Sequence, residues 1–562
     1  MNKASYPDPA FIRRNTQILD GKWDFAFDND ASMSIGSVKF DKKINVPFCY
    51  QSKMSGIDIQ DDITVVWYRR TFEYRKNTKK LLLCFGAVDY YSEIYINGVL
   101  AYFHEGGFSS FKVDITKYLD DGKNEIVVRC EDTLSTSQIR GKQSWKGDVF
   151  GCWYTATTGI WQSVWLEEAG SIYVQECLIV PDINKNRADF YIKLSDANIK
   201  RVFATLYLKG EKIGNLEFNT SGSEGLASFV FSDWDILRCD YQWSLENPNL
   251  IDVVINADDD EVFLYFGMRN VEVRGKDIFL NNHRLYQRLV LDQGYWPDSL
   301  MTPPLGEELE KDIIISKEMG FNGARKHQKI EDARYYYYAD LHGFLVWGEL
   351  PSRYSYSPHS SIAVLSQFDN YIRAKYNHPS IIAWVPLNES WGVSNILEDK
   401  KQQEFANSLA SYAKAFDDTR FISSNDGWEQ TSSGDILSVH DYSVIPQWLG
   451  ASVEMASNGR ADLRELYANG YAYDGKPIIL TEFGGIAFSD GRDDTWGYNG
   501  KVVDSDAYFN RLKALLNRVK DDKVLSGFCY TQLTDVMQET NGLLTPDRKP
   551  KLELDVYHSI FS

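Results

Sequence analysis

Two glutamates in the second half of the chain each follow a short apolar segment of the kind that forms a buried strand. Glu389 comes after the segment 381–386, and Glu482 comes directly after the segment 478–481. Two carboxyl groups about 5–5.5 Å apart can hydrolyse a glycosidic bond by double displacement, in which one attacks the anomeric carbon and the other protonates the leaving oxygen. Their shared negative charge would raise one carboxyl pKa, as a proton donor at neutral pH requires. The alternative is a pair of surface glutamates that cap helices.

The elements that must position these glutamates are strands that alternate with amphipathic helices after about residue 269. Apolar residues recur at helical spacing in 405–416 and 508–519. This alternation predicts a (β/α)8 TIM barrel. The other possibility is a doubly wound open sheet, but no Gly-rich phosphate loop is found. The eight strand candidates are 289–291, 323–327, 344–347, 381–386, 421–424, 436–440, 478–481 and 525–530.

A TIM barrel places its chemistry at the carboxyl ends of its strands. Polar side chains end most of the predicted strands, so we expect them to converge with the two glutamates on one mouth of the barrel. For three of them, Arg325, His327 and His440, an ordinary buried polar group of the barrel is the alternative interpretation. The full set is Arg325, His327, Glu349, Asn388, His440 and Tyr442.

The first 268 residues are predicted to be all-β. Short apolar segments are separated by turn residues, and the pair Asn97-Gly98 lies between two of them, which is a strong hairpin signal. Residues 170–268 continue this pattern over a length that suits an immunoglobulin-like sandwich. The chain is therefore predicted to be multidomain, with a jelly-roll β-sandwich at 1–169, an immunoglobulin-like β-sandwich at 170–268 and the TIM barrel at 269–562.

Composition and charge exclude several classes of partner. The 562 residues carry a formal net charge of −19, so the chain repels nucleic acid and anionic membrane surfaces. No apolar segment reaches the length of about 18 residues that a transmembrane helix needs. The seven cysteines are scattered without a C-x-x-C pair, which is typical of a reduced compartment. No apolar signal segment is found near the start, and we expect a cytoplasmic protein.

The strongest motif surrounds the first glutamate. The sequence NHPSIIAW at 377–384, closing on Asn388-Glu389, resembles the acid/base signature of glycoside hydrolase family 2. That family includes β-galactosidases, β-glucuronidases and β-mannosidases. Further similarity extends the resemblance over nearly the whole chain and implies the same order of a sugar-binding-type jelly roll, an immunoglobulin-like domain and a barrel. The further matching segments are 21–25, 67–70, 97–98, 158–166 and 266–269.

The resemblance implies a role for each candidate residue. Glu389 would be the acid/base, Glu482 in ILTEFG would be the nucleophile, and Asn388 would bind the sugar 2-hydroxyl. Tyr442 would hold the nucleophile, and Arg325 would lie beneath it as a charge partner. The remaining candidates would contact the sugar or form its aromatic platform. These are His327, His440, Glu349, Trp391, Trp428 and Tyr530.

Departures from the family pattern bear on the sugar. Arg325-Lys326-His327 is one residue shorter than the family's Arg-x-x-His. Bacterial β-glucuronidases hold the uronate with an Asn-x-Lys pair, and this chain has Glu539-Thr540-Asn541 at that place. We therefore expect a β-galactoside, with β-glucuronide, β-galacturonide, β-mannoside and arabinopyranoside as alternatives. A uronate could still be held by another cation, such as Lys326 or Arg140.

Three expectations concern ligands and partners. The Glu-x-His that binds magnesium in large β-galactosidases is replaced by Glu349-Leu350-Pro351, so we expect no metal and no cofactor. The substrate would be a small oligosaccharide or glycoside, and the protein could be a homo-oligomer. The segment 140–145 and the pair Trp153-Tyr154 combine polar and aromatic residues, so this loop either helps to close the sugar pocket or is simply exposed. A non-catalytic carbohydrate-binding protein and an adhesion module are the alternative functions.

Overall fold

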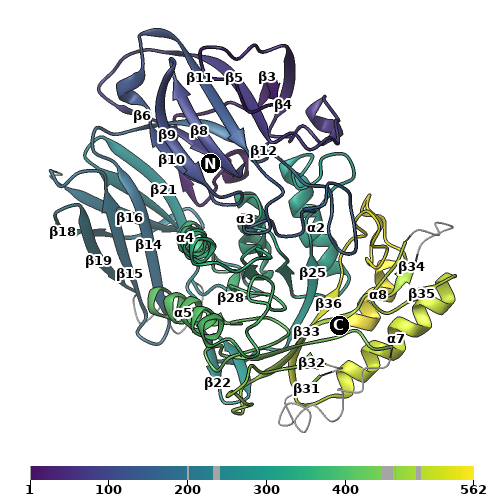
Figure 1. The fold of residues 1–562 in the computed structure, drawn as a ribbon. Helices are drawn as coiled ribbons and strands as arrows, with labels where there is room; N and C mark the ends of the chain where they lie inside the picture. The colour runs from purple at the N-terminus through teal and green to yellow at the C-terminus, as the bar shows by residue number, and fades with distance from the viewer. Residues whose placement is uncertain (1, 199–200, 232–240, 445–459, 462–463, 489–494) are drawn as a thin grey trace.

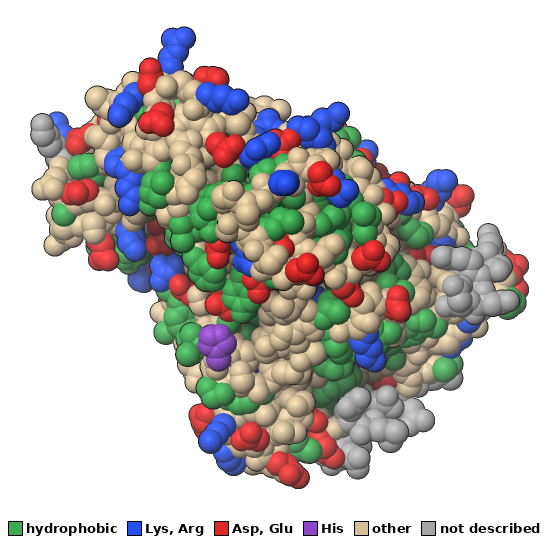
Figure 2. All heavy atoms as spheres, turned by 45° about the horizontal axis from the view of Figure 1, so that its top comes forward, with side chains coloured by type: hydrophobic (Ala, Val, Ile, Leu, Met, Phe, Trp, Pro, Cys, Tyr) green, Lys and Arg blue, Asp and Glu red, His purple; other side chains and the backbone are tan. Residues whose placement is uncertain are grey.

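The computed structural model describes residues 2–198, 201–231, 241–444, 460–461, 464–488 and 495–562. Figure 1 shows two β-sandwiches, coloured purple and blue-teal, lying beside a larger body of strands and helices that contains the C-terminal half of the chain. Basic and acidic side chains are scattered together over the face seen in Figure 2. None of the helices in the described ranges has the length and apolarity needed to cross a membrane.

The N-terminal sandwich packs two antiparallel sheets, in the orders β4-β3-β5-β11-β8-β9 and β10-β6-β13-β2. The two sheets share one apolar core. The predicted hairpin forms between β8 and β9, where Asn97 and Gly98 both adopt positive φ as a tight turn requires. The strands are β2 (Thr16–Ile18), β3 (Gly21–Asp28), β4 (Lys42–Val46), β5 (Val65–Tyr74), β6 (Lys80–Phe85), β8 (Tyr91–Ile96), β9 (Val99–Glu105), β10 (Phe111–Asp114), β11 (Gly122–Glu131) and β13 (Val164–Ala169).

The second sandwich also packs two antiparallel sheets, in the orders β1-β21-β20-β16-β17 and β14-β15-β19-β18. Its edge strand β1 comes from the start of the chain, so the N-terminal segment joins both sandwiches. The predicted sandwich architecture of this half is confirmed. The strands are β1 (Phe11–Ile12), β14 (Val174–Asp182), β15 (Arg187–Leu194), β16 (Val202–Leu208), β17 (Glu211–Glu217), β18 (Asn219–Ser221), β19 (Glu224–Val230), β20 (Ile251–Ala257) and β21 (Asp260–Phe266).

All eight predicted barrel segments are strands, and they form one parallel sheet in the order β29-β28-β27-β26-β25-β36-β33-β30. The predicted TIM barrel is confirmed. Side chains connect the two ends of this order, because Ser423 Oγ donates to Ser438 Oγ at 3.2 Å. The strands are β25 (Gln287–Asp292), β26 (Gly323–Lys326), β27 (Leu345–Glu349), β28 (Ile381–Val385), β29 (Phe421–Ile422), β30 (Leu437–Asp441), β33 (Ile478–Gly484) and β36 (Leu525–Thr531).

Among the residues that the structure describes, helices follow six of these strands and lie around the barrel (Figure 1). Their apolar residues pack in its core. Both segments predicted from apolar spacing are helices, α5 and α7, and the recurring apolar residues of α7 are buried as expected. Side-chain caps start several helices; Asp504, for example, accepts a hydrogen bond from the backbone of Ala507. The helices are α2 (Gly306–Glu318), α3 (Ala333–His342), α4 (Pro358–Lys375), α5 (Lys400–Phe416), α7 (Ser505–Asp521) and α8 (Leu554–Phe561).

A small antiparallel sheet packs its apolar residues together with barrel residues in one core. Its strands are β22 (Val271–Arg274), β23 (Asp277–Leu280) and β24 (His283–Arg284). They immediately precede β25, and Val271 and Ile278 share that core with Leu289 of β25. The polar residues that end the barrel strands lie at the opposite, carboxyl end.

Candidate active site

Glu482 lies at the carboxyl end of β33 and is held on both oxygens. Arg325 Nη1 donates to its Oε1 at 3.0 Å, and the Tyr442 hydroxyl donates to its Oε2 at 2.6 Å. Tyr442 is itself 3.0 Å from Thr531 Oγ1 at the end of β36. Only 5% of Glu482 is exposed, and this carboxylate is fixed in one orientation by Arg325 of β26 and by Tyr442, which directly follows β30.

Arg325 joins most of the acidic groups at the mouth while being fully buried itself. Its guanidinium donates to Glu349 Oε2 at 2.7 Å and to Asn388 Oδ1 at 2.5 Å, in addition to Glu482. Burial alone would lower the pKa of Arg325, but the charges of Asp426, Glu349 and Glu482 raise it well above its usual value. Arg325 and Glu349 therefore lie beneath the mouth of the barrel, where they fix the residues that line it.

Glu389 adopts a backbone conformation that is rare for a residue with a side chain. Its φ is +50°, and that of the following residue, Ser390, is +58°. Hydrogen bonds hold this turn, because Glu389 N donates to the carbonyl of Asp426 at 2.8 Å and Ser390 N donates to Asn425 Oδ1 at 3.0 Å. Backbone strain of this kind is found at functional sites, where the surrounding structure holds it in place.

His440 lies between the acidic groups of the site. Its Nδ1 is 2.8 Å from Glu389 Oε1, and its Nε2 is 2.7 Å from Asp426 Oδ1. The same ring is 3.5 Å from Glu482 Oε2. Burial alone would lower the pKa of His440, but the charge of Glu482 and the hydrogen bonds to Asp426 and Glu389 raise it to about 10. The imidazole is therefore a cation at neutral pH and donates to a carboxylate on each side.

This cation reverses one expectation from the sequence. Shared negative charge between the two glutamates was expected to raise a carboxyl pKa. Burial does act to raise the pKa of Glu389, but the hydrogen bond from His440 and its positive charge outweigh burial, and the pKa is lowered. The expected proton donor is thus ionised in the free protein, with a proton next to it on His440.

Oxygen atoms of Glu389 and Glu482 and a ring nitrogen of His440 all lie within 4.8 Å of one another. This closeness suits a pair of carboxylates that act by double displacement, since inverting glycosidases separate theirs by about 6.5–9.5 Å. Three such groups could also surround a metal ion. However, His440 carries protons on both nitrogens when it is a cation, so it then has no lone pair to offer.

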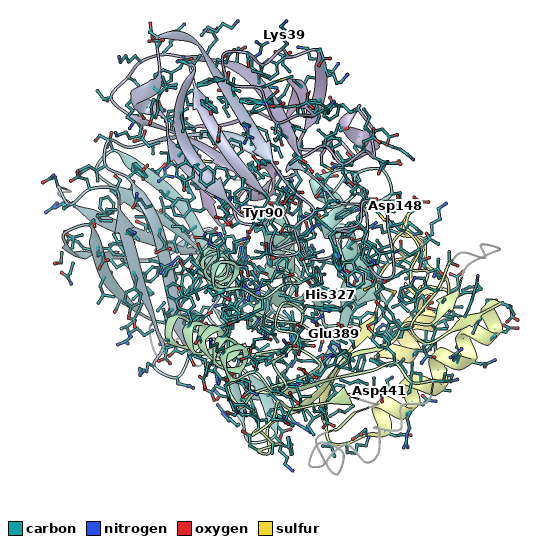
Figure 3. All side chains as sticks on the ribbon, in the orientation of Figure 1. Lys39, Tyr90, Asp148, His327, Glu389 and Asp441 are labelled. Atoms are coloured by element: carbon teal, nitrogen blue, oxygen red, sulfur yellow. The ribbon has the colours of Figure 1, made fainter. Side chains whose placement is uncertain are left out.

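The remaining predicted residues lie around this centre, and Figure 3 shows His327 and Glu389 near the middle of the molecule. His327 is buried, with Nδ1 3.0 Å from Glu349 Oε1. Burial and then the charge of Lys142 lower the pKa of His327 well below its usual value, so this imidazole is neutral.

Two of the three proposed aromatic platforms lie at the site. Trp391 Nε1 donates to Glu389 Oε2 at 3.3 Å, and the Trp428 ring lies 5.3 Å from the His440 ring in an edge-on arrangement. Tyr530 is fully buried in the barrel core, so it cannot form a platform.

The long loop that follows β11 in the first sandwich reaches the barrel mouth. The backbone N–H groups of Arg140 and Gly141 both donate to the carbonyl of Ser352 at 3.0 Å, just beyond β27. The Tyr354 hydroxyl donates to the carbonyl of Gly141. The loop is therefore not simply exposed, because it contacts the barrel beside the candidate site; its part in closing a sugar pocket stays a prediction.

Aromatic side chains of both domains meet beside Glu389. Trp153 lies 5.4 Å from Trp391, and Tyr354 lies 5.3 Å from Trp391. Trp145 lies 4.3 Å from Tyr354, and Trp153 Nε1 donates to the Tyr354 hydroxyl at 2.7 Å. We call these four residues the aromatic rim. All four keep partial exposure, which suits a surface that binds a planar or sugar group.

Several residues at the site were not among the candidates. Asp426 follows β29, and its contact with His440 makes it central to the site. Glu539 is fully buried and accepts hydrogen bonds from Tyr154 at 3.1 Å and Tyr498 at 3.2 Å. No short motif signals Glu539, because its donors come from distant parts of the chain.

The two cations suggested as uronate ligands are already paired. Lys326 Nζ lies 2.8 Å from Asp292 and 2.9 Å from Glu331, and Arg140 lies 3.2 Å from Asp132 inside the first sandwich. That suggestion is therefore wrong for both residues, since each cation is neutralised within the protein.

Family models match the two ends of this architecture. The sugar binding domain of glycosyl hydrolases family 2 matches residues 11–169, and the TIM barrel domain of the same family matches residues 271–562. The chain belongs to glycosyl hydrolases family 2. The resemblance seen in the sequence is thus confirmed.

Known family 2 relatives are distant. A putative β-glucuronidase of Formosa agariphila is 23% identical over 469 residues, which cover 77% of this chain and 54% of that protein. A β-galactosidase of Photobacterium profundum is 24% identical over 66% of this chain and 37% of its own length. The β-glucuronidase of Rattus norvegicus is 22% identical over 85% and 78%. The chain thus spans about half or less of the first two proteins.

Solved structures share the fold over the whole chain. A family 2 β-galacturonidase of Eisenbergiella tayi superimposes with a TM-score of 0.78 at 20% identity, covering 98% of this chain and 97% of that one. A β-glucuronidase of Faecalibacterium prausnitzii also gives a TM-score of 0.78, at 18% identity and 98% and 99% coverage. At this identity the likeness concerns the fold.

Proposed function

We propose that the protein is a retaining exo-β-glycosidase that removes a terminal β-linked sugar from a small glycoside. The observation that carries this proposal is the pair Glu389 and Glu482, which follow β28 and end β33, and whose oxygens lie within 4.8 Å of each other and of His440. Family membership supports the reaction class, and the short carboxylate separation favours retention over inversion.

In the first step Glu482 attacks the anomeric carbon while Glu389 protonates the departing glycosidic oxygen. The bond from that carbon to the leaving oxygen breaks, and an ester bond to Glu482 forms. Water then attacks the same carbon, gives its proton back to Glu389 and releases Glu482. Arg325 and Tyr442 hold the attacking carboxylate in one orientation during both steps.

The proton for the first step is held by Glu389 and His440 together. The two groups are 2.8 Å apart and share one proton, which lies on the imidazole in the free protein. A bound sugar excludes water from the site, and a neutral acid next to a neutral imidazole then becomes less costly than an ion pair. Transfer of the proton from His440 to Glu389 would therefore convert Glu389 to its acid form only when substrate is bound.

Neutral and acidic terminal sugars are both candidates for this reaction. The sequence favours a β-galactoside, because the glucuronidase lysine is missing. The relatives named above act, by their names, on β-galactosides, β-glucuronides or a β-galacturonide. A carbohydrate-binding protein without turnover remains the alternative from another class.

Hydrolysis of p-nitrophenyl β-glycosides tests the proposal. The galactoside, glucoside, mannoside, glucuronide, galacturonide and arabinopyranoside are assayed with the wild type, Glu482→Gln, Glu389→Gln and the surface control Glu404→Gln. We expect turnover of at least one sugar, a loss of at least about 1,000-fold in both site variants and none in the control. A 2-deoxy-2-fluoro glycoside of that sugar should add its glycosyl mass to the wild type and to Glu404→Gln, but not to Glu482→Gln. Turnover that survives Glu482→Gln would exclude Glu482 as nucleophile.

A further inference from the structure

Lys142 lies in the loop that the first sandwich extends over the barrel mouth. The backbone of Lys142 accepts a hydrogen bond from Tyr154 N at 2.8 Å, and the side chain of Tyr154 in turn donates to Glu539. The preceding residue, Gly141, fits so tightly that a Cβ there would be 2.2 Å from the carbonyl oxygen of Gln328. The position of Lys142 is therefore set by contacts on both sides.

Lys142 is largely buried, and its ammonium group has no hydrogen-bonding or ion-pairing partner among the described residues. Only 9% of Lys142 is exposed. The acidic groups that act on it are occupied by other donors: Glu539 by two tyrosines and Gln532, and Glu482 by Arg325 and Tyr442. A buried charge without a partner is costly, so a cation left in this state points to a ligand that completes it.

The charge of Lys142 is retained at neutral pH. Burial lowers its pKa, but nearby groups, including Glu539 and Glu482, outweigh burial and raise it. The same charge contributes to the lowered pKa values of Glu389 and His327. The contacts of this loop with Gln328, Tyr354 and Glu539, which all follow barrel strands, likewise place Lys142 beside the barrel mouth.

The position of Lys142 relative to the sugar follows from the barrel order. Its neighbour Glu539 comes after β36, whereas Asn388 comes after β28, four strands away in a sheet of eight. These two residues therefore belong to opposite sides of the barrel mouth. If Asn388 binds the sugar 2-hydroxyl, the far end of the ring, at C5 and C6, lies toward Lys142.

We propose that Lys142 forms an anion subsite for an acidic group at C5 or C6 of the terminal sugar. The group is the carboxylate of a uronic acid or a sulfate ester on the 6-hydroxyl, which share the chemistry of a charge-assisted hydrogen bond to ammonium. This inference rests on the proposed function and selects acidic over neutral sugars within it. The cation comes from the first sandwich rather than from the barrel.

The test compares Lys142→Met, which keeps the length of the side chain and removes its charge, with Lys146→Met, an exposed lysine of the same loop. Substrates are the p-nitrophenyl β-galactoside, β-galacturonide, β-glucuronide and β-galactoside 6-sulfate. We expect kcat/KM for the preferred acidic sugar to fall about 100-fold or more in Lys142→Met, mainly through KM. The neutral galactoside should change by less than about threefold, and Lys142→Arg should recover part of the loss.

Three results would overturn the inference. The first is a wild type that hydrolyses the neutral galactoside better than every acidic sugar. The second is an equal loss on neutral and acidic sugars in a Lys142→Met variant whose thermal midpoint is unchanged. If no sugar is hydrolysed, the proposed function fails, and tryptophan fluorescence titrations with galacturonate, glucuronate, galactose 6-sulfate and galactose test the inference instead. The third overturning result is then that no acidic sugar binds more tightly than galactose, or that the preference for an acidic sugar survives Lys142→Met.

Discussion

At the scale of single residues, His440 determines which group of the site holds the proton next to Glu389. It lies between three carboxylates, and its pKa is raised to about 10. A group whose pKa is raised on folding contributes stability that is complete below its unfolded pKa of about 6.5 and is lost as the pH rises through the folded value. His440 therefore stabilises the fold at neutral pH and progressively less toward pH 10.

His440→Gln should change both the pH profile of activity and the pH dependence of stability. In the wild type the pair with Glu389 keeps its proton until the pH approaches 10, so the alkaline limb of kcat/KM should lie high. In the variant Glu389 titrates alone, and the alkaline limb should move down by several pH units, with a loss of about 100-fold at neutral pH. The fall in thermal midpoint of the wild type between pH 6.5 and 10 should also be smaller in the variant. An unchanged alkaline limb would show that His440 does not hold the proton.

At the scale of elements, the barrel positions the two glutamates while a loop from another domain completes the site. The segment from Arg140 to Tyr154 contacts Ser352, Tyr354 and Glu539, all of which follow barrel strands. The aromatic rim and Lys142 both depend on this contact. The loop can only be held this close because Gly141 has φ of +57° and no side chain.

Gly141→Ala should displace the loop without unfolding the barrel. The added Cβ would lie 2.2 Å from the carbonyl oxygen of Gln328, and backbone cannot move aside as a flexible side chain can. We expect KM to rise about tenfold or more, with a decrease in thermal midpoint of a few degrees. Gly36→Ala in the same sandwich is the matched control, since its Cβ would meet nothing within 4 Å. If both variants keep wild-type kinetics, loop closure does not contribute to binding.

At the scale of the whole molecule, the N-terminal segment joins the two sandwiches. Strand β1 pairs with β21 in the second sandwich, whereas β2 pairs with β13 in the first. Between them, Arg13 is 2% exposed and lies 2.9 Å from Glu167 and 3.0 Å from Asp260, one in each sandwich. The relative position of the sandwiches is thus fixed by a buried ion pair that extends across their boundary.

Arg13→Ala should destabilise this junction strongly, because it leaves buried Asp260 without its cation and leaves Glu167 paired with Lys112 alone. Removal of one partner of a buried ion pair costs about 3–5 kcal/mol. We expect a clear decrease in thermal midpoint and faster proteolysis between the sandwiches, and a smaller effect on kcat. Arg14→Ala, which removes an exposed pair with Glu261 at 3.2 Å, is the control and should be close to neutral. Equal midpoints for the two variants would contradict a joining role for Arg13.

The sequence by itself determined the architecture and the main catalytic candidates. Barrel strands are buried on both faces and so appear as apolar segments, and Glu389 and Glu482 directly follow such segments. The polar ends of other strands, such as Arg325 and Tyr442, could be identified for the same reason. Local patterns are enough where a role depends on the residue's place along one strand.

Only the tertiary structure decided the charge interactions at the site and which residues from other segments lie beside the two glutamates. The pKa of Glu389 is lowered because His440, 51 residues away, donates to it, and no local pattern reports that contact. Lys142 and Glu539 come from different domains, and Lys326 and Arg140 proved to be paired inside the protein. Charge interactions act through space and depend on burial, so their sign and strength emerge only when distant segments are brought together.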